Sequence, residues 1–167
     1  MRNQTFKFSA PIEKLDEKGS YTAVFLPEVL ISKLPKGRLR VKGFINSTPF
    51  SLAIQYRKNG FRFFLISGAL RREAKVKLAE TVNVRFILVD NDMVEIPEEL
   101  SIVLEQDIEA NELWNSFSSA WKRGFSHYVN SVKNTDSRIK RAIQIMEKAK
   151  RGKLYAQIEK KKKENTE

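Results

Sequence analysis

The sequence predicts an α+β protein in which a small β-barrel comes first and an all-helical module follows. Apolar residues alternate with polar ones as far as residue 88, and after Pro97 they recur at helical spacing. Six strand-like segments at short spacing, with only brief helical pieces between them, favour a closed or nearly closed barrel. The expected parts are residues 1–94 for the barrel, 97–151 for the helical module and 152–167 for a basic, flexible tail.

The strands are predicted from alternation and from the turn residues between them. Asn46–Pro49 is typical of a hairpin turn, and Asn59-Gly60 is the strongest hairpin signal in the chain because glycine tolerates the positive φ of a tight turn. The predicted strand segments are 5–15, 21–26, 38–46, 50–56, 61–65 and 82–88.

The helices are predicted from capping residues and apolar stripes. Pro97 is the expected first helical residue, and Glu98 and Glu99 follow in the first turn, where the helix dipole favours carboxylates. Ser118 or Ser119 is expected to cap a third helix, and a fourth is expected to begin after 134–136. The residues expected to form the core of this module are Trp121, Phe125, Val129, Ile139, Ile143 and Met146.

The net charge of +11 is unevenly distributed along the chain. Residues 1–96 carry 17 basic and 9 acidic side chains, residues 97–119 carry 6 acidic and no basic ones, and residues 120–167 carry 14 basic and 5 acidic ones. This asymmetry indicates a polyanionic partner, either nucleic acid, an anionic membrane surface or an acidic protein. The alternative is that the charges serve solubility and that Lys160–Lys163 lie in a solvated tail.

The chain shows no recognisable catalytic, metal or cofactor site. Because it has no cysteine, it has no thiolate nucleophile and no disulfide, which fits a reducing cytoplasm. The only histidine, His127, has no carboxylate three or four residues away to orient it as a base. Phosphate-loop and hydrolase motifs are absent from the sequence, and the longest apolar run, Phe86–Val89, is too short to span a bilayer. We therefore expect a cytoplasmic protein that is not an enzyme.

The candidate binding residues are cations on or beside the third and fourth helices. Arg138 and Arg141 are three residues apart, so they share a helical face on which both can grip one phosphate or carboxylate. The alternative is that these residues pair with the acidic helix that begins at Glu98. The predicted anion-binding residues are Lys122, Arg123, Lys133, Arg138 and Arg141.

The helical part resembles the YdeI/OmpD-associated (OmdA, bacteriocin-protection) family. That family's helical module opens with Pro-x-x-Leu and later has the run Ala-Lys-x-x-x-Thr-Arg-x-x-Arg. Here Pro97–Leu100 matches the opening, and Val132-Lys133, Ser137-Arg138 and Arg141 stand at the positions of the run.

The first half is similar to the uncharacterised small-barrel domain that often precedes this module. Residues 39–46, 49–50 and 68–72 carry this similarity. Ala79-Glu80 replaces the family's usual Gly-Asp, so the sequence does not decide whether the tight turn with positive φ forms here. The resemblance implies a double-split barrel like that of the AbrB-like transcription factors, and a bacterial protein.

Three functional hypotheses follow from these observations. The first is a non-enzymatic binding, stress-protection or bacteriocin-protection protein that contacts its partner through the basic helical surface. The second is a nucleic-acid-binding regulator. The third is an enzyme or binder that holds a small anionic ligand in a barrel mouth ringed by Arg57, Arg62 and Arg71.

Overall fold

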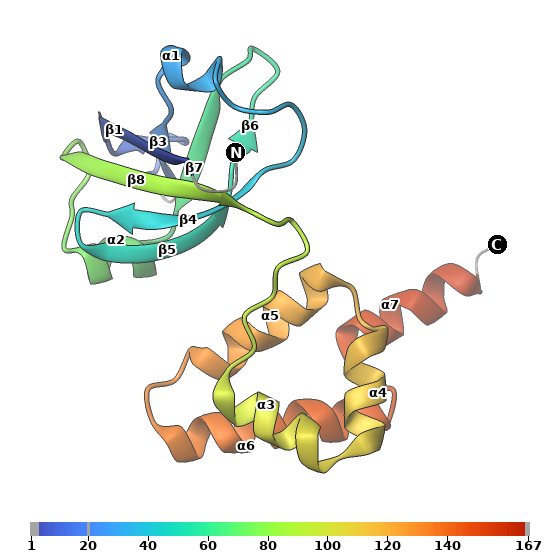
Figure 1. Cartoon of the computed structure of the whole chain (residues 1–167). Coiled ribbons are helices and arrows are strands. Elements are labelled where there is room, and N and C mark those ends of the chain that lie inside the picture. The colour runs from blue at the N-terminus through green and yellow to red at the C-terminus, as the bar shows by residue number, and fades with distance from the viewer. Residues whose placement is uncertain (1–3, 20, 166–167) are drawn as a thin grey trace. The chain divides into compact units, whose positions relative to one another are not determined.

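In the computed structural model, which describes residues 4–19 and 21–165, the chain divides between Asn91 and Asp92 into two units (Figure 1). The first unit contains two antiparallel four-stranded sheets and two short helices, α1 (Glu28–Ile31) and α2 (Gly68–Ala74). The second unit contains helices only, in the part of it that is described. The predicted α+β class, with strands first and helices after, is therefore confirmed.

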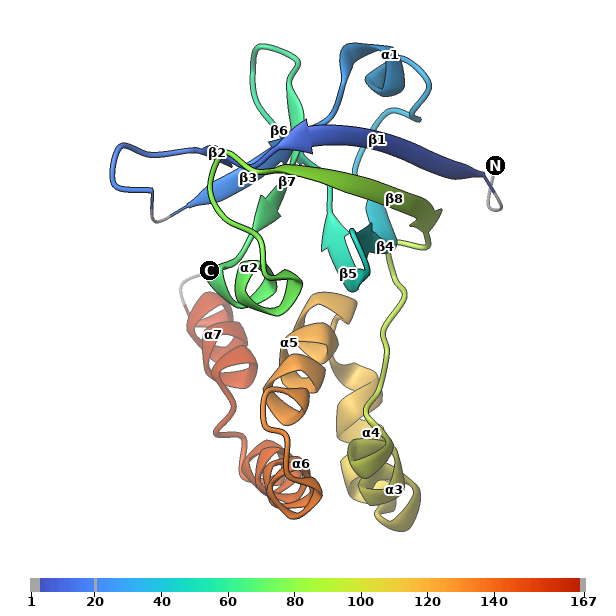
Figure 2. The same cartoon turned by 90° about the vertical axis from the view of Figure 1, so that its left-hand side faces the viewer.

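The first sheet has the strand order β1-β8-β4-β5, and the second has the order β2-β3-β7-β6. Strands β1 and β8 run side by side over their length, as both views show (Figure 2). The strands of the first sheet are β1 (Thr5–Pro11), β8 (Thr81–Val89), β4 (Arg40–Ile45) and β5 (Thr48–Ala53). Those of the second are β2 (Glu13–Lys14), β3 (Thr22–Phe25), β7 (Arg62–Ile66) and β6 (Gln55–Tyr56).

Two bent segments of chain take part in both sheets. The predicted strand 5–15 breaks at Ile12 into β1 and β2, and the predicted strand 50–56 breaks at Ile54 into β5 and β6. Both isoleucines are buried, and their amides donate to backbone carbonyls outside their own strands, Ile12 to Glu80 at 3.0 Å and Ile54 to Leu39 at 2.9 Å. Among the described residues no ladder joins the two sheets, so the prediction of a closed barrel is wrong.

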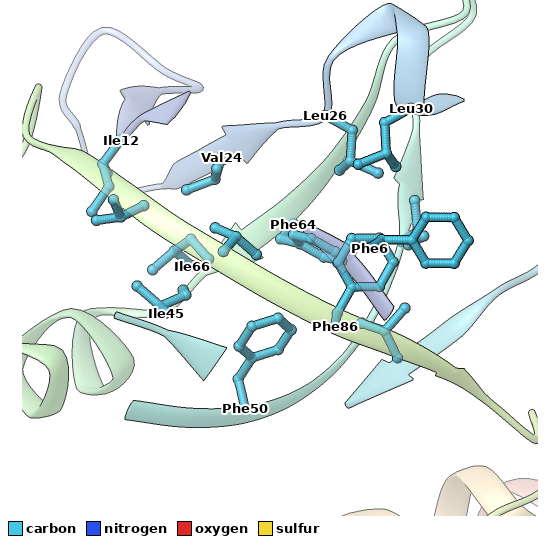
Figure 3. Packing of buried hydrophobic residues seen from close by; sticks show 14 of the residues in the cluster. Phe6, Ile12, Val24, Leu26, Leu30, Ile45, Phe50, Phe64, Ile66 and Phe86 are labelled. Atoms are coloured by element: carbon cyan, nitrogen blue, oxygen red, sulfur yellow. The ribbon is translucent and has the colours of Figure 1, made fainter. Parts of the chain in front are cut away.

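The core between the sheets is built around phenylalanine rings. Phe86 lies 5.2 Å from Phe6 and 5.3 Å from Phe64 between ring centroids, and Phe50 lies 5.3 Å from Phe64. Figure 3 shows these side chains gathered beside β8, with aliphatic side chains such as Ile45 around them. Burial of several aromatic rings supplies much of the apolar area that stabilises this unit.

Gly43 permits β4 and β8 to approach at the centre of the first sheet. It is paired with Phe50 of β5 and Phe86 of β8. A Cβ atom at Gly43 would lie 2.1 Å from the Arg85 carbonyl oxygen and 2.7 Å from the Cβ atom of Phe86. The backbone, which cannot move aside as a flexible side chain can, therefore excludes any larger residue at this position.

The turn before β8 keeps a positive φ without a glycine. Ala79 has φ of 66°, and its amide donates to the Ile12 carbonyl at 2.8 Å. The Glu80 carboxylate accepts from the Lys77 amide at 2.9 Å and closes the same turn. The tight turn with positive φ is therefore present although alanine replaces glycine. It carries the steric cost of a Cβ atom in the left-handed region.

The helical unit contains five helices in its described part. Pro97 is the N-cap of the first helix, so the helix begins one residue later than predicted, with Glu98 and Glu99 in its first turn as predicted. Ser118 and Asn134 cap later helices by accepting amide hydrogen bonds from Trp121 and Ser137. The helices are α3 (Glu98–Gln106), α4 (Ile108–Ser116), α5 (Ser119–Asn130), α6 (Thr135–Lys150) and α7 (Tyr155–Glu164).

The core of the helical unit matches the prediction on α5 at Val129 and only in part at Phe125 and Trp121. Val129 is fully buried, and Trp121 and Phe125 are half-buried in stacked rings with centroids 6.0 Å apart. Trp114 of α4 is buried and packs 6.4 Å from Phe125. Trp121 also contacts Tyr155 of α7, so this aromatic row runs from the core to the surface.

On α6 the predicted face is partly wrong. Met146 is buried, but Ile139 and Ile143 are 39% and 46% exposed. The side chains that α6 buries are Ala142, Ile145, Met146 and Ala149. Small alanines on this face allow the neighbouring helices to approach closely, and the buried stripe includes Ile145 in place of Ile139 and Ile143.

The range 152–167, predicted as a flexible tail, contains α7. Leu154 belongs to the core cluster, and Ala156 is buried. Gln157 ties the start of α7 to the end of α6, because its side-chain nitrogen donates to the Ala149 carbonyl at 2.8 Å while its oxygen accepts from the Leu154 amide at 3.0 Å. This stretch of the chain therefore packs against the helical unit.

Gly43→Ala is expected to lower the free energy of unfolding of the first unit by about 3 kcal/mol or more, because the added Cβ overlaps backbone atoms. Urea denaturation followed by circular dichroism measures the change. The matched control is Gly124→Ala on α5, where a Cβ meets no atom within 4 Å and should stabilise the helix by about 1 kcal/mol. Equal stability of Gly43→Ala and the wild type would contradict the close approach of β4 and β8.

Ala79→Gly is expected to stabilise the first unit by about 0.5–1 kcal/mol. Relief of the left-handed strain outweighs the larger conformational entropy that glycine has in the unfolded chain. The reverse change at Gly60, which has φ of 87° and open space around it, should destabilise by a similar amount in the same denaturation assay. A destabilised Ala79→Gly variant would show that the alanine side chain contributes more than its backbone strain costs.

Candidate functional site

Two of the predicted anion-binding residues bind the last turn of α5 and the turn that follows it. Arg138 donates from Nε to the Val132 carbonyl at 2.8 Å. Arg141 donates from Nη1 to the Tyr128 carbonyl at 2.8 Å and to Ser131 Oγ at 2.7 Å, and its guanidinium lies 4.4 Å from the centre of the Tyr128 ring. The last carbonyls of a helix carry partial negative charge, which Arg141 complements at Tyr128, and both arginines hold the α5–α6 turn by their hydrogen bonds.

Acidic side chains from α3 and α4 meet α6 at two ion pairs. Arg138 lies 3.7 Å from Glu99 between Nη1 and Oε1, and the Glu99 side chain is only 13% exposed. Lys150 donates a hydrogen bond to Asp107, the N-cap of α4. This hydrogen bond is the main cause that lowers the pKa of Asp107 and raises the pKa of Lys150. Part of the acidic charge of residues 97–119 is therefore neutralised inside the unit.

The other predicted cations lie at different places on the helical unit. Lys122 and Arg123 are half-buried near the start of α5, and Arg123 also donates to the Met93 carbonyl at 3.4 Å. Lys133 is exposed in the turn between α5 and α6. At 1.5 Å of rise per residue, α5 extends roughly 12 Å from Lys122 to its last residue, Asn130, and Lys133 lies in the turn beyond that end. The predicted set therefore forms two groups, one at each end of this helix.

The arginines predicted to ring a barrel mouth do not line a common site. Arg57 lies over Phe25 and Phe63, at 5.5 and 5.7 Å from the ring centres. Arg62 lies over Tyr56 at the start of β7, whereas Arg71 is on α2, which follows the other end of that strand. A strand of this length separates its ends by roughly 13 Å. These guanidinium groups are used singly, two of them against aromatic rings.

A further group of polar residues, which the sequence reasoning missed, lies on the first sheet. A hollow of about 390 Å³ opens on this sheet between exposed side chains of β1 and β8 and the β4–β5 turn. The only sequence signal for it is that none of the four strands β1, β4, β5 and β8 contains an acidic residue. The residues that line the hollow are Lys7, Phe8, Ser9, Asn46, Asn83, Val84 and Arg85.

Within the described part of the chain, none of the helices has the length and apolar character needed to cross a bilayer.

His127, the histidine considered as a general base, is exposed in the last turn of α5. Its surroundings give it no defined role.

Two family models match the chain, one for each unit. Residues 8–86 match a domain of unknown function, DUF1905, and residues 93–152 match OmdA, described as bacteriocin-protection, YdeI or OmpD-associated. Both resemblances stated from the sequence are thereby confirmed. A comparison with curated proteins found no match.

Replacing Arg138 and Arg141 together by alanine is expected to lower the free energy of unfolding of the helical unit by about 2–4 kcal/mol. The change leaves carbonyls at the end of α5 unpaired and removes the partner of Glu99, which is largely buried. Lys140→Ala, on an exposed position of the same helix, is the control and should change stability by less than about 0.5 kcal/mol. Unchanged thermal and urea unfolding of the double variant would show that the arginines do not hold the turn.

Proposed function

Because the chain carries a DUF1905 domain followed by an OmdA domain, we propose that it is a non-enzymatic binding protein whose helical module contacts a polyanion. The contact surface, called the helical basic surface below, is formed by Lys122, Arg123, Lys133, Arg138 and Arg141. The description of the OmdA family as bacteriocin-protection supports a protective role for this binding.

The observation that carries the proposal is the placing of these cations at both ends of α5. A single phosphate or carboxylate is too small to reach cations at both ends of a helix that extends roughly 12 Å from Lys122 to its last residue. A polyanion reaches both, since one strand of duplex DNA advances about 3.4 Å along the axis for each phosphate. The spacing therefore favours a chain of charges over a small anionic ligand.

The ion pairs within the helical unit also shape this surface. Glu99 and Asp107 are paired with cations of α6, so they do not face a bound polyanion as free carboxylates. Lys133 and Lys140 remain exposed near the α5–α6 turn. Arg138 and Arg141, at the same turn, are half-buried and fix its backbone while adding positive potential beside the lysines.

Contacts that rest on charge alone give weak binding without sequence preference, with a steep dependence on salt. A regulator that reads bases would instead discriminate between sequences. Among the candidate polyanions, nucleic acid and an acidic protein are distinguished by direct binding measurements.

We expect labelled duplex DNA to bind at micromolar protein and low salt in fluorescence anisotropy, with equal affinity for two unrelated sequences. Lys122→Ala with Lys133→Ala should reduce the slope of log affinity against log salt by about 1.8, at 0.9 for each phosphate that the lysines neutralise in the wild type. Lys18→Ala with Lys58→Ala removes the same charge from exposed loops of the first unit and is the matched control.

Absence of duplex binding by the wild type, with binding of poly-glutamate retained, would assign the surface to an acidic protein. Absence of both, or equal slopes for the two double variants, would contradict the proposed function. Lysine substitution is preferable to truncation at residue 152, because truncation removes the buried Leu154.

A further inference from the structure

The outer face of the first sheet carries cations and no carboxylate. Lys7 of β1, Arg85 of β8 and Phe44 of β4 are register partners and form one row across three neighbouring strands. None of the strands β1, β4, β5 and β8 contains Asp or Glu. The Lys7 and Arg85 side chains give this part of the face a positive potential that attracts anions.

The hollow beside this row presents hydrogen-bond donors. The Asn46 side-chain oxygen accepts a hydrogen bond from the Asn83 backbone amide at 3.0 Å. The Asn83 side-chain oxygen accepts one from Ser9 Oγ at 2.6 Å. These bonds use the acceptor oxygens of both side chains and leave their NH₂ groups as donors. Together with the Lys7 ammonium and the Arg85 guanidinium, the lining is complementary to phosphate oxygens.

An aromatic ring lies next to these donors. The Arg85 guanidinium is held 4.4 Å from the centre of the Phe44 ring, and the Phe44 side chain is still 37% exposed. The phosphate-binding cations Lys7 and Arg85 therefore lie in one row with the Phe44 ring, against which the Arg85 guanidinium is stacked. Both are surfaces on which unpaired bases stack.

We propose that this face, formed by Lys7, Ser9, Phe44, Asn46, Asn83 and Arg85, is a binding site for single-stranded nucleic acid. Phosphodiester groups lie against the donors of the hollow, and a base packs on Phe44 and Arg85. A duplex would leave Phe44 unused, because its bases are already stacked and paired. A small phosphate ester is less suitable, since the hydrogen-bonding residues of the hollow are exposed, whereas small-molecule sites enclose most of their ligand.

The site is independent of the helical basic surface, because its residues all belong to the other unit. Arg40 and Lys42 extend the same face toward the far end of β4, but both have partners of their own and are not counted among the binding residues. The two surfaces can therefore be tested on the full chain with separate substitutions.

The test measures anisotropy of a labelled 12-nucleotide single strand and of the duplex made from it, over a series of salt concentrations. We expect Lys7→Ala with Arg85→Ala to weaken single-strand binding at least tenfold and to reduce the salt slope by about 1.4, at 0.7 for each phosphate on single strands. Phe44→Leu, which keeps the charge and an apolar side chain, should weaken single-strand binding about fivefold to a hundredfold and leave the slope unchanged.

Two double variants serve as controls that remove charge elsewhere. Lys18→Ala with Lys58→Ala, in loops of the same unit, should leave single-strand affinity unchanged within about twofold. Lys122→Ala with Lys133→Ala should affect duplex binding and spare the single-strand contact at the sheet. If Lys7→Ala with Arg85→Ala does not fold by circular dichroism, Lys7→Gln with Arg85→Gln replaces it.

Equal affinity of the Lys7→Ala, Arg85→Ala variant and the wild type for the single strand would overturn the proposal. So would displacement of the oligonucleotide by 10 mM inorganic phosphate at constant ionic strength, because it would indicate a site for a small anion. Loss of duplex binding only in the Lys122→Ala, Lys133→Ala variant would support the proposed function of the helical basic surface. It would leave the proposal for the sheet face unchanged.

Discussion

The close approach of β4 and β8 at Gly43 is the constraint on which the first unit depends. Without a Cβ atom at this position, the Phe86 side chain can enter the core, where it contacts Phe6 and Phe64. The next pair along the same two strands, Phe44 and Arg85, faces the opposite side of the sheet, because side chains alternate along a strand. One short backbone distance thus fixes both the packing of the core and the row of residues on the outer face.

In the helical unit the same charges hold the helices together and shape the surface. Arg138 joins the α5–α6 turn to Glu99 of α3, and Lys150 joins α6 to Asp107 at the start of α4. An ion pair that is partly buried needs hydrogen bonds to offset desolvation, and these pairs have them at the helix ends. Binding of a polyanion would then rely on the exposed lysines, with the arginines as a fixed support.

The two candidate surfaces differ in the chemistry that they offer. The helical basic surface consists of cations at the two ends of one helix, and it suits a partner recognised by charge. The sheet face combines cations with amide donors and an aromatic ring, which suits a strand whose bases are unpaired. The second combination arises because three strands bring Lys7, Arg85 and Phe44 into one row, although these residues are far apart in the sequence.

The sequence by itself determined the order of strands and helices, the alternation of the strands and the cap of α5, because these depend on neighbours within a few residues, whereas α6 begins earlier than predicted, at Thr135. Apolar residues surround much of α6, so the sequence allowed several buried stripes, and only packing against other helices selected Ile145 over Ile143. The prediction of a closed barrel was wrong, since the bends at Ile12 and Ile54 depend on hydrogen bonds to the distant residues Glu80 and Leu39. The sheet face could not be found from the sequence for the same reason: cross-strand register, which local patterns do not encode, brings its residues together.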